Sequence, residues 1–162
     1  MYIATDKLPA DSRIWIYQSN RELTADEIEH INSSTREFLE SWTAHNEALK
    51  AGFEIRYNRF LILMVDQKAA GASGCSIDKS VHFIKSLEKK FNLDFFDRMS
   101  FAFKRDGSVE VLPRQEFEKL YQNGALNSDT IVFNNLIETK GELALNWEIP
   151  VKKSWHQSIL AA

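Results

Sequence analysis

The chain opens with alternating hydrophobic and polar positions and then changes to helical spacing. Residues 13–18, Arg-Ile-Trp-Ile-Tyr-Gln, alternate and are rich in β-formers, which predicts the first strand. Thr24 and Glu27 then form a capping-box pattern ahead of apolar residues with the spacing of a helix. We therefore predict a helix from about 25 to 44, ending near His45 or Asn46, and a break at Gly52.

The middle of the chain predicts strands followed by a second helix. Residues 54–57 and 59–66 are strand-like, as one long strand or as a hairpin, and the second stretch is apolar on both faces, which is typical of a central strand. Residues 67–73 form a loop of small residues. We expect Asp78 to cap a helix that runs to about Phe91. Its inward side chains would be Val81, Ile84, Leu87 and Phe91.

The second half predicts a hairpin and a third helix. Asp106-Gly107 separates two β-like runs, 99–104 and 108–112, which is a strong signal for a tight turn. Pro113 then opens a helix over 114–122, and Gly124 ends it. The pattern weakens after 134. The remaining expectations are a short strand at 130–133 and the packing of Trp147 and Trp155 onto the body.

This order of elements predicts an α+β fold with a mixed or antiparallel sheet covered by about three helices. The chain has 162 residues, of which 44% are hydrophobic and 27% charged, the balance of a globular protein. No repeat, low-complexity tract or linker divides it. We therefore predict one globular domain over residues 1–162.

Charge and cysteine content exclude several classes of function. The formal net charge is −3, without the basic excess of a general nucleic-acid binder. The longest apolar run, residues 60–65, is far shorter than the about 20 residues of a membrane span. The single cysteine, Cys75, rules out an intramolecular disulfide and fits a reducing compartment. We expect a cytoplasmic protein that neither spans a membrane nor binds nucleic acid in general.

The unusual segment runs from 66 to 80, between an apolar strand and a helix, where a phosphate-binding loop would sit. A Walker A loop needs two glycines and a terminal Lys-Ser. Lys79-Ser80 supplies that ending, but the glycine positions hold Ser73 and Asp78. The carboxylate of Asp78 would repel a phosphate. We expect no functional ATPase of the ABC type.

The string Ser73-Gly-Cys-Ser-Ile-Asp-Lys-Ser80, with Arg59-Phe60 ahead of it and Trp42-x-x-His45 upstream, resembles a family of small uncharacterised bacterial proteins. These proteins often carry the label ABC transporter ATPase. The similarity covers most of the chain, from Trp15 to Trp155. The resemblance implies no established activity.

Cys75 suggests nucleophilic chemistry, because amide dipoles at a helix N-terminus favour a thiolate. The candidate bases are His82, which lies four residues after Asp78 on one helical face, and His45. A small buried residue in a tight turn is the structural alternative. The histidines show no ligand spacing, so we expect no metal and no other cofactor.

Three hypotheses follow. The first is a non-catalytic binding module for a small anion or a protein partner, and the second is a cysteine-dependent enzyme with Cys75 as nucleophile and His82 or His45 as base. In the third, the segment is a structural turn of an interaction protein. The sequence does not set the oligomeric state. The candidate ligand-binding residues are Ser73, Gly74, Ser76, Asp78, Lys79 and Ser80.

Overall fold

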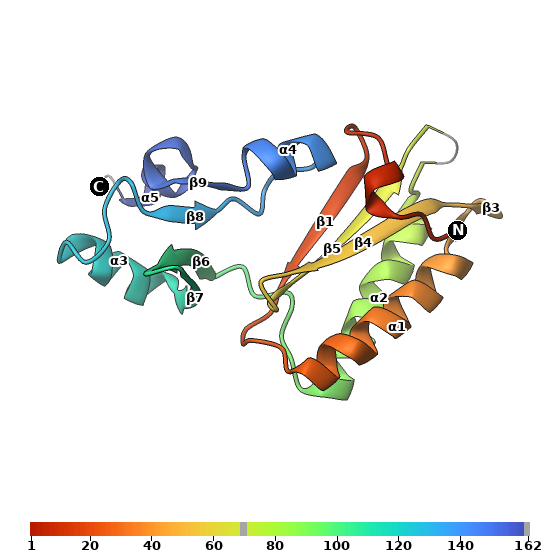
Figure 1. Cartoon of the computed structure of the whole chain (residues 1–162), viewed down its shortest axis with the longest axis horizontal. Helices are drawn as coiled ribbons and strands as arrows, with labels where there is room; N and C mark the ends of the chain where they lie inside the picture. The colour runs from red at the N-terminus through yellow and green to blue at the C-terminus, as the bar shows by residue number, and fades with distance from the viewer. Residues whose placement is uncertain (69–70, 161–162) are drawn as a thin grey trace. The chain divides into compact units, whose positions relative to one another are not determined.

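The computed structural model describes residues 1–68 and 71–160, so Ala69 and Ala70 of the expected small-residue loop lie outside the described residues. The chain divides into two compact units (Figure 1), the first Met1–Phe96 with Glu138–Gly141 and the second Asp97–Ile137 with Glu142–Ala162. Both contain helices and antiparallel sheet, so the α+β class is confirmed. That they act as one domain stays a prediction.

The first unit is built on a three-stranded antiparallel sheet in the order β1-β5-β4. Its central strand is buried on both faces from Phe60 to Val65, as the double-sided apolar pattern predicted. Of the two alternatives for 54–66, the hairpin is correct, because Tyr57 and Asn58 take positive φ angles of 54° and 51° and turn the chain. The bounds are β1 Arg13–Gln18, β4 Lys50–Arg56 and β5 Phe60–Asp66.

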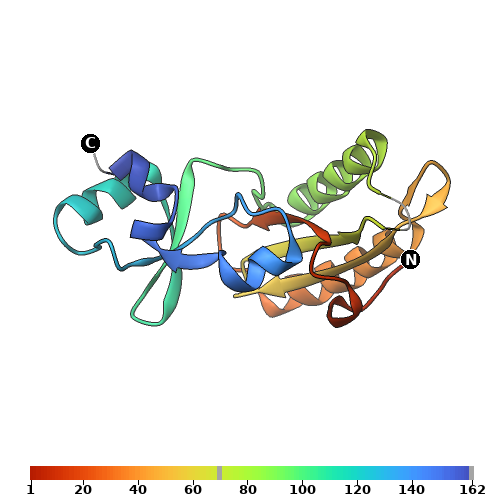
Figure 2. The same cartoon turned by 90° about the horizontal axis from the view of Figure 1, so that it is seen from above.

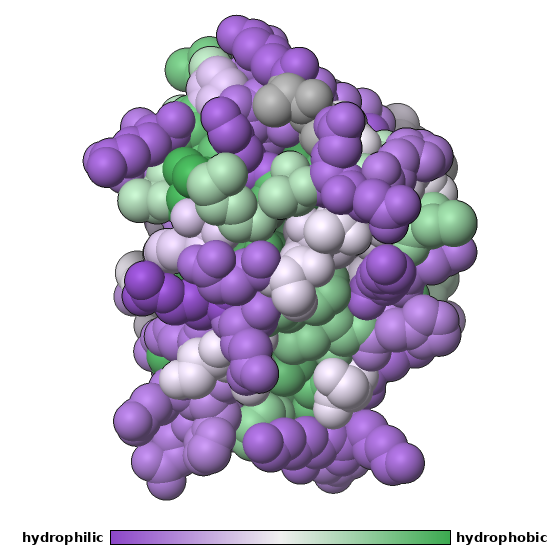
Figure 3. All heavy atoms as spheres, turned by 90° about the vertical axis from the view of Figure 1, so that its right-hand side faces the viewer, coloured by the Kyte–Doolittle hydropathy of each residue, from purple (hydrophilic) through white to green (hydrophobic). Residues whose placement is uncertain are grey.

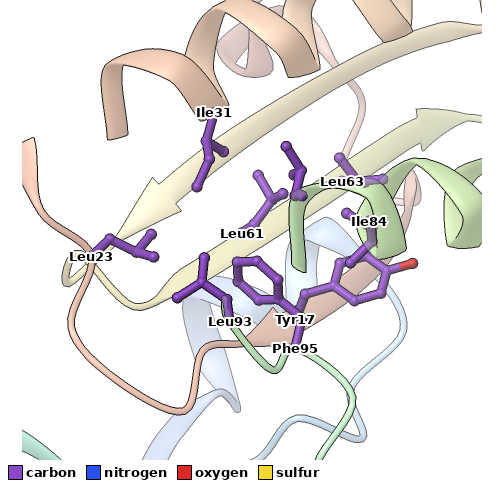
Figure 4. Close-up of a cluster of buried hydrophobic side chains, with 9 residues drawn as sticks. Tyr17, Leu23, Ile31, Leu61, Leu63, Ile84, Leu93 and Phe95 are labelled. Carbon is purple, nitrogen blue, oxygen red and sulfur yellow. The ribbon is translucent and has the colours of Figure 1, made fainter. Parts of the chain in front are cut away.

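Two helices, α1 (Ala25–Ser41) and α2 (Gly74–Phe91), cover one face of this sheet (Figures 1 and 2). The predicted capping box at Thr24 is present, with the Glu27 amide donating to the Thr24 hydroxyl over 3.2 Å. Ile31 of α1 and Ile84 of α2 point toward the sheet (Figure 4). The cluster they share comprises Tyr17, Leu23, Ile31, Leu61, Leu63, Ile84, Leu87, Leu93 and Phe95.

Two expectations about the end of α1 and the start of β4 are wrong. The helix ends at Ser41 rather than near 44, because Trp42 turns away in an extended conformation. A short hairpin follows, of β2 (Thr43–Ala44) and β3 (Glu47–Ala48), whose turn residues His45 and Asn46 have φ angles of 51° and 64°. Gly52 does not break the chain. It lies inside β4, where an added Cβ would stand 2.5 Å from the carbonyl oxygen of Ile3.

Each edge of the sheet is joined by a further segment of the chain through a single β-bridge. Tyr2 forms a parallel bridge to Ala51 of β4, and a short 3-10 helix, η1 (Thr5–Lys7), follows it. At the other edge Thr139 forms an antiparallel bridge to Arg13 of β1. The Lys140 ammonium donates to the Leu8 carbonyl over 2.7 Å, which holds residues 138–141 in the first unit.

The second unit has a four-stranded antiparallel sheet in the order β7-β6-β8-β9. The predicted hairpin is confirmed: Asp106 and Gly107 form its two-residue turn with φ angles of 53° and 80°. The third helix is also confirmed, and Gly124 follows it with a φ of 84°. The bounds are β6 Ser100–Arg105, β7 Ser108–Pro113, α3 Arg114–Gln122, β8 Ile131–Phe133, β9 Glu148–Pro150, η2 Val151–Lys153 and α5 His156–Leu160. The helix α4, Lys140–Leu145, begins in the first unit and continues in the second.

The core of the second unit is aromatic and contains a buried histidine. Trp147 packs at 4.9 Å on Phe133, and Trp155 lies edge-on to Phe101 at 5.4 Å, so both tryptophans pack as expected. His156 is only 1% exposed and stacks on Trp155 at 3.9 Å. Burial lowers the pKa of His156 to about 4.

This histidine makes the stability depend on pH. Unfolded His156 takes up a proton near its ordinary pKa of 6.5, whereas the folded side chain does so only near 4. Stability from this group is therefore complete above about pH 6.5 and falls by up to about 3 kcal/mol as the pH drops to about 4. We expect His156→Gln to flatten this part of the pH profile in urea unfolding. Equal slopes for the wild-type protein and the variant would contradict the account.

Candidate functional site

The segment 73–80 forms the first two turns of α2, and the helix begins earlier than its sequence suggests. Ser73 is the N-cap: its hydroxyl accepts the Ser76 amide at 3.2 Å, while the Ser76 hydroxyl accepts the Ser73 amide at 2.7 Å. This is a capping box made by two serines. The expected cap, Asp78, is the fifth residue of the helix and is exposed. The prediction that Asp78 caps α2 is therefore wrong.

A buried hydrogen bond joins this turn to the end of α1. The indole nitrogen of Trp42 donates to the carbonyl oxygen of Ser76 over 2.8 Å, and Trp42 is only 2% exposed. The Trp42 ring also contacts Trp15 edge-on at 6.3 Å and Phe38 at 5.3 Å. Because a buried indole N–H needs an acceptor, this bond fixes where α2 begins relative to α1. It brings together the two sequence motifs, Trp42-x-x-His45 and 73–80.

The candidate ligand-binding residues divide into inward and outward groups. Ser76 and Ser80 are each about 1% exposed, and the Ser80 hydroxyl donates to the Ile77 carbonyl over 2.6 Å. Their hydroxyls serve the packing of α2 and do not face a ligand. The exposed members of the segment are Gly74, Cys75, Asp78 and Lys79.

The first turn of α2 presents free amides to solvent. Within the described chain, the amides of Gly74 and Cys75 have no hydrogen-bond acceptor, as the first residues of a helix require. The first turn has no acidic side chain, and a Cβ on Gly74 would meet nothing within 4 Å. These amides and the positive end of the helix dipole make the turn open to an anion.

The structure does not assemble a nucleophile with a base. Cys75 is a free, exposed thiol, which overturns its interpretation as a buried packing residue. His82 follows it by seven residues on α2, so the two lie about 10 Å apart along the helix axis, beyond hydrogen-bond reach. His45 lies at the tip of the β2–β3 hairpin. Among the described residues neither histidine has a hydrogen-bond partner.

The geometry also departs from a Walker A loop. In such a loop the Lys-Ser pair lies where the helix begins, next to the phosphates. Here Lys79 and Ser80 come after the first turn of α2, and the Ser80 hydroxyl is buried inside the fold. Nothing in the arrangement of α2 supports the ABC transporter ATPase label.

Other classes of site find no support in the described residues. In residues 1–68 and 71–160, no three His, Cys, Asp or Glu side chains gather as metal ligands. No helix of this part of the chain is long and apolar enough to cross a membrane. Comparisons with protein-family models, curated proteins and solved structures find no match. The family resemblance drawn from the motifs therefore stays a prediction.

The cap of α2 gives a direct test of this geometry. Ser73→Ala removes the acceptor of the Ser76 amide and should lower the free energy of unfolding by about 0.5–2 kcal/mol. Ser73→Asp keeps an acceptor and should restore most of the loss. Asp78→Ala should change stability by less than about 0.5 kcal/mol, because Asp78 caps nothing. Urea unfolding of the three variants decides the matter, and a larger loss for Asp78→Ala than for Ser73→Ala would contradict the assignment.

Proposed function

We propose that the chain is a non-catalytic, cytoplasmic binding module whose α2 N-terminus receives an anionic group of a small molecule or a protein partner. The observation that carries this proposal is the pair of exposed amides at Gly74 and Cys75, which have no acceptor in the described chain. An anion placed there accepts hydrogen bonds from both amides and lies at the positive end of the dipole of an 18-residue helix.

The charges of neighbouring side chains set the affinity of this site for an anion. Lys79 follows Cys75 by four residues, so its ammonium lies on the same face of α2 and attracts an anion. Asp78 lies three residues from Cys75 and opposes it. Both side chains are exposed, so water and salt reduce each contribution. The site is therefore suited to recognising a charged group that a larger ligand carries.

The exposure of Cys75 supports a second candidate, a cysteine-dependent enzyme. The Trp42–Ser76 bond holds the base of the β2–β3 hairpin against α2, which makes His45 the better of the two candidate bases. A nucleophile and its base should be within hydrogen-bond reach. No such bond joins Cys75 to a histidine within the described residues, so we favour the binding module.

Titration with inorganic phosphate, followed by amide NMR, tests the proposal. We expect the largest shifts at the amides of Gly74 and Cys75. Lys79→Gln should weaken binding and Asp78→Asn should tighten it, each by about two- to fivefold for an exposed charge. MgATP should bind this site more tightly than inorganic phosphate only to the extent that its larger negative charge accounts for.

Matched changes separate this site from general charge effects. Lys153→Gln removes one exposed positive charge from the second unit and should leave the shifts at Gly74 and Cys75 unchanged. Shifts spread over all lysine-rich surfaces, or equal affinities for Lys79→Gln and Asp78→Asn, would overturn the binding proposal. In the same samples, alkylation of Cys75 that slows in His45→Ala would favour the enzyme instead.

A further inference from the structure

The outer surface of the helix pair carries opposite charges on its two helices. The exposed carboxylates of α1 recur at intervals that keep them on one face, and the guanidinium of Arg36 on the same helix lies over the Tyr2 ring at 4.6 Å. The exposed lysines of α2 are spread over the outward half of that helix, where Asp78 is the one exposed carboxylate. Within the described chain, none of these side chains forms an ion pair. The acidic row comprises Asp26, Glu29, Glu37 and Glu40, and the basic row comprises Lys79, Lys85, Lys89 and Lys90.

Half-buried aromatic rings lie between the two rows. Phe38 of α1 stacks on Phe83 of α2 with ring centroids 4.6 Å apart and planes within 4° of parallel. Further along the seam His30 lies 5.9 Å from Phe91. Figure 3, which views the end of the helix pair where α1 finishes and α2 begins, shows apolar surface between hydrophilic borders. The helix face therefore has an acidic side, an aromatic centre and a basic side.

The ring contacts also set the register of the two rows. Phe38 meets Phe83 and His30 meets Phe91, so α1 and α2 run antiparallel. Glu37 is then level with the region of Lys85, and Glu29 is level with the end of α2, which carries Lys89 and Lys90. Glu29, Glu37 and Glu40 therefore each have a basic position near the same height on α2, whereas Asp26 lies beyond the end of α2.

We infer that this face docks a second copy of the chain. A two-fold axis parallel to the helices, lying in the plane of the contact, places α1 of each protomer over α2 of its partner. That arrangement sets Glu29, Glu37 and Glu40 opposite ammonium groups and brings the two aromatic seams together. A two-fold axis across the helices would instead place α1 on α1 and α2 on α2, and like charges would repel.

The charge pattern favours this occupant over other anionic partners. Adjacent helices pack about 8–10 Å apart, so a membrane surface or a nucleic-acid duplex that covers α2 also meets α1. The four carboxylates of α1 then oppose it. A second copy avoids this repulsion, because the lysines of its α2 lie over the acidic row of α1.

The size of this face sets the expected affinity of the dimer. A helix of 18 residues is about 27 Å long, and two helices side by side are about 20 Å wide. The contact would bury roughly 1,000 Å² in total, at the low end of specific interfaces. The dimer should therefore be reversible, depend on protein concentration and dissociate in high salt.

Charge reversal on one helix at a time tests the inference. In light scattering coupled to size exclusion, with reductant present to prevent a Cys75 disulfide, the wild-type chain should approach twice 18.7 kDa as its concentration rises. Lys85→Glu/Lys89→Glu and Glu29→Lys/Glu37→Lys should each be monomeric. Mixed together, the two variants should form a heterodimer, because each reversed helix then faces its complement. None of these residues belongs to the proposed anion site.

The controls keep the outcome decisive. Lys50→Glu/Lys153→Glu makes the same change in net charge on exposed residues elsewhere and should still dimerise. A wild-type chain that is monomeric at every concentration would overturn the inference, as would a reversed variant that still dimerises alone. Binding of an acidic peptide, such as oligoglutamate, by a strictly monomeric chain would assign the basic row to another partner and would also overturn it. Lys79 belongs to both surfaces, so the phosphate shifts at Gly74 and Cys75 are measured in the monomeric Glu29→Lys/Glu37→Lys variant, where they test the anion site apart from dimerisation.

Discussion

One buried hydrogen bond, from the Trp42 indole to the Ser76 carbonyl, determines how the end of the first unit that carries the candidate site is arranged. A tryptophan buries a large ring, but its N–H still needs an acceptor in the core. In this structure α1 ends just before Trp42, and the Trp42 ring packs against Trp15 and Phe38 while its N–H reaches an acceptor. The end of α1, the β2–β3 hairpin and the first turn of α2 are thereby linked at one point.

The exposed chemistry of the site follows from that link. With the Ser76 carbonyl held inside, the neighbouring residues Gly74 and Cys75 lie on the outer side of the first turn. The serine capping box uses the amide of Ser76 and leaves the two preceding amides to solvent. The same fixed helix pair carries the charged rows of the proposed dimer face, so both proposals rest on the packing of α2 against α1.

Local signals predicted much of the fold. The capping box at Thr24 and the Asp106-Gly107 turn need only neighbouring residues, and both formed as expected. The start of α2 was predicted too late because its inward face begins with Ser76 and Ser80, which an apolar pattern does not count as core positions. Gly52 was misread because its need for glycine comes from Ile3, a contact that is distant in sequence. The sequence could therefore single out the segment of the candidate site, but it could not show which of its residues face solvent.

Hydrogen exchange in Trp42→Phe tests the central claim most directly. Phenylalanine keeps an aromatic ring in the core but cannot donate to the Ser76 carbonyl. The account predicts faster exchange at the amides of residues 77–80, which close the first turns of α2, with little change at 87–91 near its other end. Phe38→Leu, which alters a ring beside Trp42 but keeps the indole N–H, serves as the control for packing. Unchanged protection of 77–80 in Trp42→Phe, or an equal loss in Phe38→Leu, would contradict the claim that this bond positions the site.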